Sequence, residues 1–450
     1  MIHSFTKGGR NLCLDVGSGA LHLLDDLGKK VVPFYPGENA DDIVRRLQGE
    51  YSREEVSACL AELDALSTVG MWNTPLTEEP LPSDDGLVKA LCLHVAHDCN
   101  LRCGYCFAST GGFDGIRSLM DPTVGKRALD FLMEHSGDRH HLEVDFFGGE
   151  PMMNYPAVKE MVAYGRKLER RWGKEIAFTL TTNCYDVPAD AIGFLNGEME
   201  NLVLSIDGRK EVHDSMRPVV GGDGSYDRAL ENARRIVANR GEGEYYVRGT
   251  FTRKNLDFHK DVLALLDAGF SYVSVEPVVL EEGHALGIRE EDLPQIQAEY
   301  DRLLGVLLRR KAKGLSSHFF HFQVDLSGGP CLRKRLSGCG CGREYMAVTP
   351  QGDLYPCHQF VGREEWQLGN ILDGEVREEK RTLFLRNNVR EKQACMDCWA
   401  QYLCAGGCAA NAQAYSGSIL EPNPLECQLL RMRMECALAF SAEGMLAENA

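Results

Sequence analysis

The sequence has no apolar run long enough to span a membrane, and its first residues lack the basic start, apolar middle and small-residue cleavage site of a secretory signal. Basic residues are also outnumbered, since 49 lysines and arginines face 66 aspartates and glutamates, for a net charge of −17. This negative charge disfavours nucleic acid or an anionic membrane as the main partner. We therefore expect a cytoplasmic protein that binds neither a membrane nor nucleic acid.

Cysteine, in contrast, is abundant: the chain of 450 residues has 17 cysteines, and ten of them follow position 330. Thiols in the cytoplasm stay reduced, so this content points to metal binding rather than disulfides. A chain of this length also exceeds one hydrophobic core, which predicts two or three domains. The carboxy-terminal part is expected to carry metal chemistry of its own.

Three cysteines share one short loop, in which Cys99, Cys103 and Cys106 have the spacing C-x-x-x-C-x-x-C. Thiolates set this closely can converge on one face of a cubane iron–sulfur cluster, and three ligands leave one iron open to a small molecule. The alternative is three unconnected core cysteines. The loop resembles that of the radical S-adenosylmethionine (SAM) enzymes, whose open iron binds SAM. The resemblance implies a [4Fe–4S] cluster and SAM as cofactors.

Strand and helix patterns alternate from residue 86 to residue 320, as they do in parallel βαβ units. A helix is predicted to begin with Asp121 as N-cap and Pro122 as its first residue. The strands are predicted at residues 87–95, 141–147, 176–182, 202–207, 245–251 and 272–279. Six strands are too few for a closed barrel of eight, so we predict an α/β fold built on a partial (β/α)6 TIM barrel. Its chemistry should lie at the carboxyl ends of the strands, in a mouth that admits a peptide.

Two motifs at strand ends extend the resemblance to radical SAM enzymes. The second strand runs into a Gly-Gly-Glu-Pro turn with Gly149 and Glu150, similar to the turn that contacts the SAM amino group. The fourth strand ends at Ser205, and Arg217 follows twelve residues later, as in the branch that modifies peptides and proteins. The resemblance implies that Ser205 and Arg217 contact SAM, and the planar fork of arginine suits a carboxylate. A surface Arg217 paired with Asp214 is the alternative.

By their positions relative to the family's motifs, the resemblance also implies that Tyr105 and Gly149 lie near SAM and that Val279 lies against the adenine. Arg248 and Glu276 also lie at strand ends, where salt-bridge roles are an equal expectation.

Residues 1–85 are predicted to form a separate domain. Apolar residues alternate over 12–16 and again from 21 to 23 around a Gly-Ser-Gly turn, which predicts a β-hairpin. Helices follow at 40–48 and after a capping box of Ser52 and Glu55. This order resembles the winged-helix peptide-recognition element of enzymes that modify ribosomally made peptides, which binds a leader peptide by strand addition. A structural cap or a dimerisation domain is the alternative, and the proline-rich stretch 73–86 is the predicted linker.

Residues 321–450 contain a second cysteine series with a C-x-x-C pair and further cysteines on both sides. The series resembles the SPASM extension, which carries two auxiliary [4Fe–4S] clusters and would bring the total to three. A single zinc knuckle is the alternative, because zinc also takes four thiolates. The family's ligation pattern assigns Cys395, Cys398, Cys404 and Cys427 to an outer cluster and Cys339, Cys357 and Cys408 to an inner one. Cys341 is a further possible ligand of the inner cluster.

Other cysteines are not assigned to clusters. Cys331 and Cys436 are expected as buried or surface thiols, and four more fit apolar faces of strands or helices: Cys13, Cys59, Cys92 and Cys184.

Across the whole chain the sequence resembles the thioether-forming maturases of six-cysteine (SCIFF) peptides, notably in the run Gly352 to Phe360. In that family the inner cluster keeps an open iron that can take a substrate cysteine. Anaerobic sulfatase maturases resemble the same region but have an aspartate base after the Cys357-type cysteine. Here His358 takes that position and is the candidate catalytic residue.

The resemblance implies that a radical derived from SAM takes a hydrogen atom from a carbon of a bound peptide, and that a cysteine sulfur then bonds to that carbon. The expected partners are a cysteine-rich precursor peptide, whose leader binds the N-terminal domain, and an electron donor such as flavodoxin or ferredoxin. Formylglycine formation is the alternative activity. A non-catalytic iron–sulfur electron-transfer or peptide-binding protein is the alternative class, but it would need neither the Gly-Gly-Glu-Pro turn nor the pair of Ser205 and Arg217.

Overall fold

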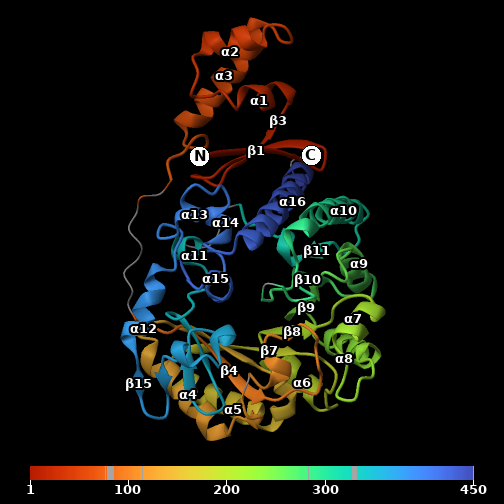
Figure 1. Cartoon of the computed structure of the whole chain (residues 1–450), viewed down its shortest axis with the longest axis vertical. Coiled ribbons are helices and arrows are strands. Elements are labelled where there is room, and N and C mark those ends of the chain that lie inside the picture. The colour runs from red at the N-terminus through yellow and green to blue at the C-terminus, as the bar shows by residue number, and fades with distance from the viewer. Residues whose placement is uncertain (77, 79–85, 114, 282, 327–331, 449–450) are drawn as a thin grey trace.

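The computed structural model describes residues 1–76, 78, 86–113, 115–281, 283–326 and 332–448. Figure 1 shows a small N-terminal sheet with its helices at one end of the long axis and the parallel sheet with its helices at the other. The C-terminal segment lies beside the parallel sheet, and its last helix, α16 (Pro424–Glu448), runs back to the N-terminal sheet. Most of the predicted linker, 73–86, falls outside the described residues.

The N-terminal sheet is antiparallel, with the order β1 (Ile2–Lys7), β2 (Arg10–Asp15) and β3 (Leu21–Leu24). The predicted hairpin is confirmed as β2 and β3, whereas β1 was not predicted. The helices are α1 (Asp26–Val31), α2 (Ala40–Leu47) and α3 (Arg53–Thr68), and the capping box of Ser52 and Glu55 is present.

The central strand β2 is buried on both of its faces from Leu12 to Asp15, because successive side chains of a strand point in opposite directions. Cys13 packs into a core of its own with Val31, Ile43 and Val56 from the three helices. Leu14, its neighbour in sequence, packs instead beside Leu438 of α16.

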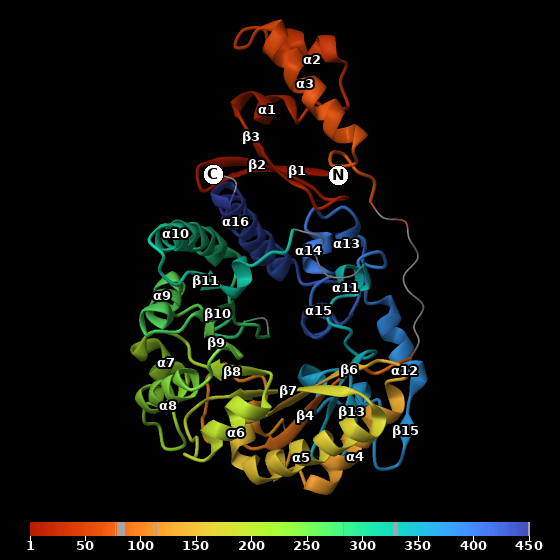
Figure 2. The ribbon, with the colours of Figure 1, turned by 180° about the vertical axis from the view of Figure 1, so that it is seen from behind.

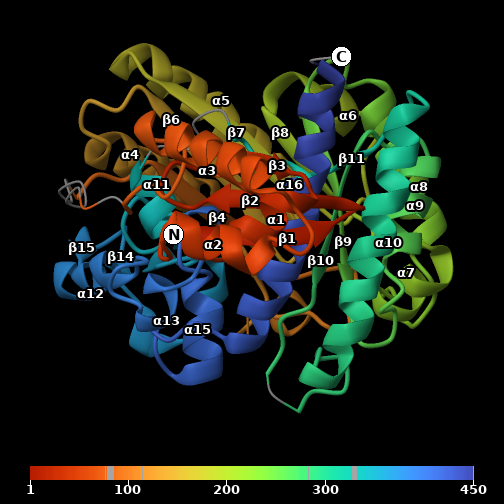
Figure 3. The ribbon, with the colours of Figure 1, turned by 90° about the horizontal axis from the view of Figure 1, so that it is seen from above.

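Ion pairs fix this sheet to the rest of the molecule. Lys7 Nζ lies 3.0 Å from an Asp301 oxygen on α10 (Leu293–Ala312), and Arg10 Nε lies 2.7 Å from an oxygen of Glu443 on α16. The ring of His3 stacks on Trp399 of the C-terminal segment at 3.9 Å between centroids. Viewed from above, the sheet lies across α16 (Figure 3).

The large sheet contains the six predicted parallel strands, which are confirmed with small shifts of their ends. They are β4 (Ala90–His97), β6 (His141–Gly148), β7 (Glu175–Thr182), β8 (Asn201–Ser205), β9 (Glu244–Phe251) and β10 (Tyr272–Pro277). The sheet does not close. Its β10 side continues into β11 (His318–Phe319), and its β4 side continues into β12 (Tyr345–Val348), which pairs parallel with β4.

Neither β11 nor β12 was predicted. Beyond β12 the sheet runs antiparallel through β13 (Asp353–Tyr355), β14 (Gly369–Asn370) and β15 (Glu375–Val376), while β5 (Ser118–Leu119) pairs with β4.

Helices cover the convex face of the parallel strands (Figure 2). They are α4 (Pro122–His135), α5 (Tyr155–Trp172), α6 (Ala191–Glu198), α7 (Lys210–Met216), α8 (Tyr226–Ala238) and α9 (His259–Asp267). The predicted start of α4 is confirmed, since Asp121 Oδ1 accepts a hydrogen bond from Thr123 N. Along β6 the fully buried residues alternate, with Val144 and Phe146 in the main core. The residues between them, such as Asp145, face the concave side and leave it for polar groups.

The C-terminal segment is built from short helices: α11 (Leu332–Ser337), α12 (Glu378–Leu383), α13 (Gln393–Met396), α14 (Gln401–Cys404) and α15 (Ala409–Ser416). No helix in the described part of the chain is both long and apolar enough to cross a membrane.

Candidate active site

A cavity of about 300 Å³ opens where the parallel strands end at their carboxyl termini. Its lining includes every residue that the sequence assigned to the initiating cluster or to SAM, together with the candidate His358. These residues are Cys99, Cys103, Tyr105, Cys106, Gly149, Glu150, Ser205, Arg217, Val279 and His358. Residues up to 259 positions apart therefore meet around one space, since the strands place their ends at one edge of the sheet.

The cysteine loop follows β4 and is held by backbone hydrogen bonds to the end of α7 and to the segment after it. Arg102 N donates to Pro218 O at 2.7 Å, and Gly104 N donates to Met216 O at 2.8 Å. On the other side, the Asn183 side chain lies 3.7 Å from Cys99 Sγ. Burial raises the pKa of the Cys99 thiol to about 12 and that of Cys103 to about 11. A positively charged metal centre would offset this cost, because binding to a metal deprotonates a thiol.

The Gly-Gly-Glu-Pro turn after β6 lies directly against this loop. A side chain at Gly149 would place its Cβ 2.1 Å from the Asp98 carbonyl oxygen, so only glycine fits. Glu150 is buried and accepts hydrogen bonds from Asn183 N at 2.7 Å and Thr182 Oγ1 at 2.8 Å. Burial raises the pKa of Glu150 to about 7, and no basic side chain of the described residues pairs with it. The site can therefore accept a cationic group.

Arg217 is buried, and it pairs with Asp207 rather than with Asp214. Its Nη2 donates to Asp207 Oδ1 at 3.0 Å, so the alternative of a surface pair with Asp214 is wrong. Tyr105 Oη also donates to Asp207, at 2.7 Å, and its ring lies 5.5 Å from the Arg217 guanidinium. Arg217 Nε is buried without a hydrogen-bond partner in the described residues. A donor left unpaired in a cavity fits an incoming carboxylate.

These observations match the chemistry of SAM bound at an open iron of a cluster. Three thiols stand together at one wall, Arg217 offers an unused donor for a carboxylate, and Glu150 is a buried acceptor without a cation. The sequence missed Asp207 as the residue that joins Tyr105 and Arg217. The signal was its position two residues after β8, within the motif that contains Ser205.

The opposite wall of the cavity comes from the C-terminal segment, through His358, Gln359 and Asn411. His358 Nδ1 lies 3.3 Å from Tyr345 Oη, and its ring packs 5.0 Å from Phe147. Burial lowers the pKa of His358 to about 4, so the imidazole is neutral near pH 7. Gln359 Nε2 lies 3.9 Å from Cys408 Sγ, which connects the cavity to the inner cysteines.

Arg248 and Glu276 line the same cavity and form an ion pair with each other. The salt bridge, one of two equal expectations for these residues, is therefore present.

The inner cysteines lie together behind this wall, and the Cys339–Cys341 segment is not extended. Gly338, Gly340 and Gly342 have φ of 68°, 73° and 74°, so the segment turns tightly and brings both cysteines to the same set. The buried Cys341 is hydrogen-bonded to Cys357, whereas Cys339 is exposed. Cys341 is therefore at least as well placed for an inner cluster as Cys339.

The outer cysteines are brought together as predicted for one set: Cys395, Cys398, Cys404 and Cys427. The chain turns sharply between Cys404 and Cys408, where three residues have positive φ: Ala405, Gly406 and Gly407. Because of this turn, Cys404 lies with the outer cysteines and Cys408 with the inner ones. Lys392 is completely buried beside the set and donates from Nζ to Gly406 O at 2.7 Å.

The sulfur atoms of the described cysteines do not stand at the spacing of a formed zinc site. Thiolates around one tetrahedral zinc ion lie about 3.8 Å apart. In the described ranges, no three cysteines place their sulfur atoms within 4.8 Å of one another.

Of the cysteines not assigned to clusters, Cys13, Cys92, Cys184 and Cys436 are buried and Cys59 is partly buried. Cys331 lies outside the described residues.

An open parallel barrel with a three-cysteine loop at the end of its first strand defines the radical SAM class. Residues 85–230 match the 4Fe-4S single cluster domain family, and residues 339–399 match SPASM, an iron-sulfur cluster-binding domain. The chain is a radical SAM protein with a SPASM domain, and it is homologous to the mycofactocin maturase MftC and to anaerobic sulfatase-maturating enzymes.

Two curated relatives show the extent of this homology. MftC of Mycolicibacterium smegmatis is 27% identical over 353 residues, which cover 76% of this chain and 83% of MftC. The cysteine-type anaerobic sulfatase-maturating enzyme of Clostridium novyi is 22% identical over 340 residues, which cover 71% of this chain and 87% of that enzyme.

Solved structures share the fold. Native anSMEcpe with bound AdoMet and the Cp18Cys peptide has a TM-score of 0.65 at 20% identity and covers 80% of this chain and 99% of its own. Streptococcus suis SuiB bound to its precursor peptide SuiA has a TM-score of 0.56 at 16% identity and covers 95% of this chain and 98% of its own. The second match therefore includes most of the N-terminal module.

Proposed function

We propose that this protein is a radical SAM maturase that modifies a ribosomally made, cysteine-rich precursor peptide by forming thioether crosslinks. The coarser part, a SPASM-type enzyme acting on peptides, is supported by relatives that are named as maturases and by the structure of SuiB with its precursor peptide. The finer part, the thioether, rests on the position of the inner cysteines behind the cavity wall.

The observation that carries the proposal is that one cavity has two different walls. One wall holds the initiating cysteine loop, Gly149 and Arg217, and the other holds His358 and Gln359 next to the inner cysteines. A peptide carbon in the cavity would face the first wall while a thiol of the same peptide faces the second. Such proximity turns bond formation into an intramolecular step.

When bound, SAM and the reduced cluster supply the 5′-deoxyadenosyl radical that removes a hydrogen atom from the peptide carbon. The residues of this chain hold the groups in place: Asp207 orients Tyr105 and Arg217, and Arg217 offers its fork to the SAM carboxylate. The neutral His358 can accept the proton of a substrate thiol at its free ring nitrogen while Nδ1 stays near Tyr345. The sulfur–carbon bond replaces one S–H and one C–H bond, and the second electron passes to an acceptor such as an auxiliary cluster.

We propose three [4Fe–4S] clusters, with Cys99, Cys103 and Cys106 on the first and Cys395, Cys398, Cys404 and Cys427 on the outer one. For the inner cluster we propose Cys341, Cys357 and Cys408, and the hydrogen bond between Cys341 and Cys357 supports this choice over Cys339. This choice leaves one iron for a substrate thiolate. A flavodoxin or ferredoxin is the proposed electron donor.

The N-terminal module is proposed to bind the leader peptide. Its sheet has β3 at one edge, where unpaired backbone groups can accept a further strand. Leu23 of β3 is 45% exposed and offers an apolar contact there.

Formylglycine formation is the second candidate, because a cysteine-type anaerobic sulfatase-maturating enzyme is among the relatives. The histidine at position 358, where those maturases resemble this region but have an aspartate, argues against it.

The test is incubation of the anaerobically reconstituted protein with SAM, a reductant and a cysteine-rich precursor peptide encoded beside its gene. We expect each crosslink to lower the peptide mass by two hydrogens and to remove one thiol that can be alkylated. Formylglycine formation from cysteine would instead replace the sulfur by oxygen and also remove two hydrogens, and mass spectrometry separates this change clearly from a thioether. Cleavage of SAM with no change in several such peptides would refute peptide maturation.

A further inference from the structure

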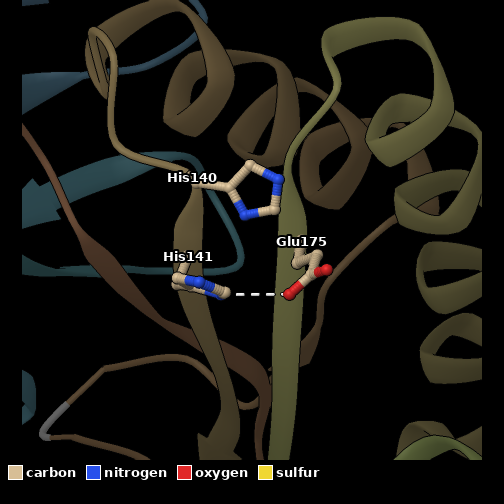
Figure 4. Close-up of side chains that lie close together, drawn as sticks. All are labelled: His140, His141 and Glu175. Atoms are coloured by element: carbon tan, nitrogen blue, oxygen red, sulfur yellow. Dashed lines mark ion pairs between the residues drawn. The ribbon is translucent and has the colours of Figure 1, made fainter.

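A group of potential metal ligands lies at the edge of the parallel sheet opposite to the cavity. His140 directly precedes β6, His141 is the first residue of β6, and Glu175 is the first residue of β7 (Figure 4). Their ligand atoms all lie within 4.8 Å of one another, and no other three histidine, cysteine or acidic residues do so in the described chain. The cysteine loop, in contrast, follows the carboxyl end of β4, so this group is separate from the cluster chemistry.

The geometry of the group is set by strand pairing. His141 and Glu175 are direct neighbours across the parallel strands β6 and β7, and Glu175 N donates to His140 O at 2.9 Å. The His141 Nδ1 atom lies 3.0 Å from Glu175 Oε2, and the two imidazole rings are 4.8 Å apart between centroids. The spacing of the three side chains is therefore set by the hydrogen-bonded pairing of β6 with β7.

Charge and exposure at the site also suit a cation. The flanking basic residues are engaged elsewhere: Lys174 Nζ donates to Ser136 Oγ at 2.7 Å, and Arg139 Nη2 donates to Glu344 at 2.8 Å. All three candidate ligands are exposed, so a bound ion could keep water in its remaining positions.

We propose that His140, His141 and Glu175 form a surface site for a divalent transition cation such as Zn²⁺. Two imidazole nitrogens and one carboxylate oxygen are ligands that Zn²⁺, Co²⁺ and Ni²⁺ accept, and they do not suit the harder Mg²⁺ or Ca²⁺. The ion links β6 and β7 where both strands begin. Its binding stabilises the folded sheet, because the three ligands come together only in the folded chain.

The test is calorimetric titration of Zn²⁺ into the untagged, cluster-reconstituted protein under anaerobic conditions. We expect one site that disappears in the double variant His140→Asn/His141→Asn and is at least about tenfold weaker in Glu175→Gln. The matched control is Glu143→Gln, which removes an exposed carboxylate from the same strand outside the group and should leave the site intact. All four proteins must show the same cluster absorption, which excludes an effect through the cysteines.

An anomalous-scattering map at the zinc edge from a soaked crystal locates the ion independently. Density between His140, His141 and Glu175 supports the proposal. An unchanged isotherm in the double variant, or zinc only at cysteines, overturns it.

Discussion

At the scale of single residues, Asp207 shows how one carboxylate organises a wall of the cavity. It is fully buried, accepts from Tyr105 and Arg217, and also accepts from Thr250 N at 2.9 Å. The Asp207 carboxylate outweighs the effect of burial and raises the pKa of Arg217, so the guanidinium keeps its charge. Arg217 is thus fixed before any ligand arrives, which lowers the entropy lost on binding.

The two cysteines of the Gly338–Gly342 turn give a prediction at this scale. Cys341→Ala should lose about four of twelve irons, because Cys341 contacts Cys357, whereas Cys339→Ala should keep nearly all of them. Iron and sulfide analysis of the reconstituted variants measures this. Loss of the same iron from both variants would mean four protein ligands and a closed inner cluster, with electron transfer as its role.

Lys392 gives a second prediction, because it is a buried cation among the outer cysteines. A nearby positive charge stabilises the more negative, reduced state of a cluster. Lys392→Met should therefore lower the reduction potential of the outer cluster, by about 60 mV if the equilibrium changes tenfold. A redox titration followed by electron paramagnetic resonance measures the shift, with Lys159→Met on α5 as control. An unchanged potential in Lys392→Met would show that the lysine has only a structural role.

At the scale of elements, the turn after β6 depends on its second glycine. Gly149→Ala would drive a methyl group into the Asp98 carbonyl and displace the start of the cysteine loop. We expect this variant to bind SAM at least about tenfold more weakly and to lose iron from the first cluster. Gly193→Ala is the matched control, since its Cβ meets nothing within 4 Å in helix α6 and should stabilise by about 1 kcal/mol. Equal SAM affinity in both variants would contradict the role of the turn.

The six parallel strands could be predicted because each has a local pattern: buried residues alternate along β6 and β7, and helix signals such as Asp121 and Pro122 lie between. The strands β11 and β12 could not, because two to four residues carry no periodicity and their partners are distant in sequence. The cysteine spacing predicted which residues meet at the first cluster. It could not decide between Cys339 and Cys341, because the answer depends on the backbone angles of three glycines.

At the scale of the whole molecule, the N-terminal sheet proposed to bind the leader lies at one end of the long axis and the parallel sheet lies toward the other (Figure 1). Removing residues 1–85 would uncover the face of α16 beside Leu438, so a point substitution is the cleaner test. Leu23→Asp on β3 should weaken leader binding by at least tenfold, about 1.4 kcal/mol, while SAM cleavage without peptide stays the same. Fluorescence anisotropy with a labelled leader measures this. Val69→Asp, at another exposed apolar residue of the module, is the control, and equal affinity in both would place the leader elsewhere.

The parallel pairing of β12 with β4 has a consequence for how the protein is made. On the ribosome, β4 emerges roughly 250 residues before its neighbour β12, so the edge of β4 from Ala90 to Leu93 lacks this partner through most of translation. An unpaired strand edge invites association with other chains. Strong overexpression, in which many incomplete chains are present at once, should therefore yield insoluble protein. Slower synthesis should increase the fraction of soluble protein even when iron is plentiful.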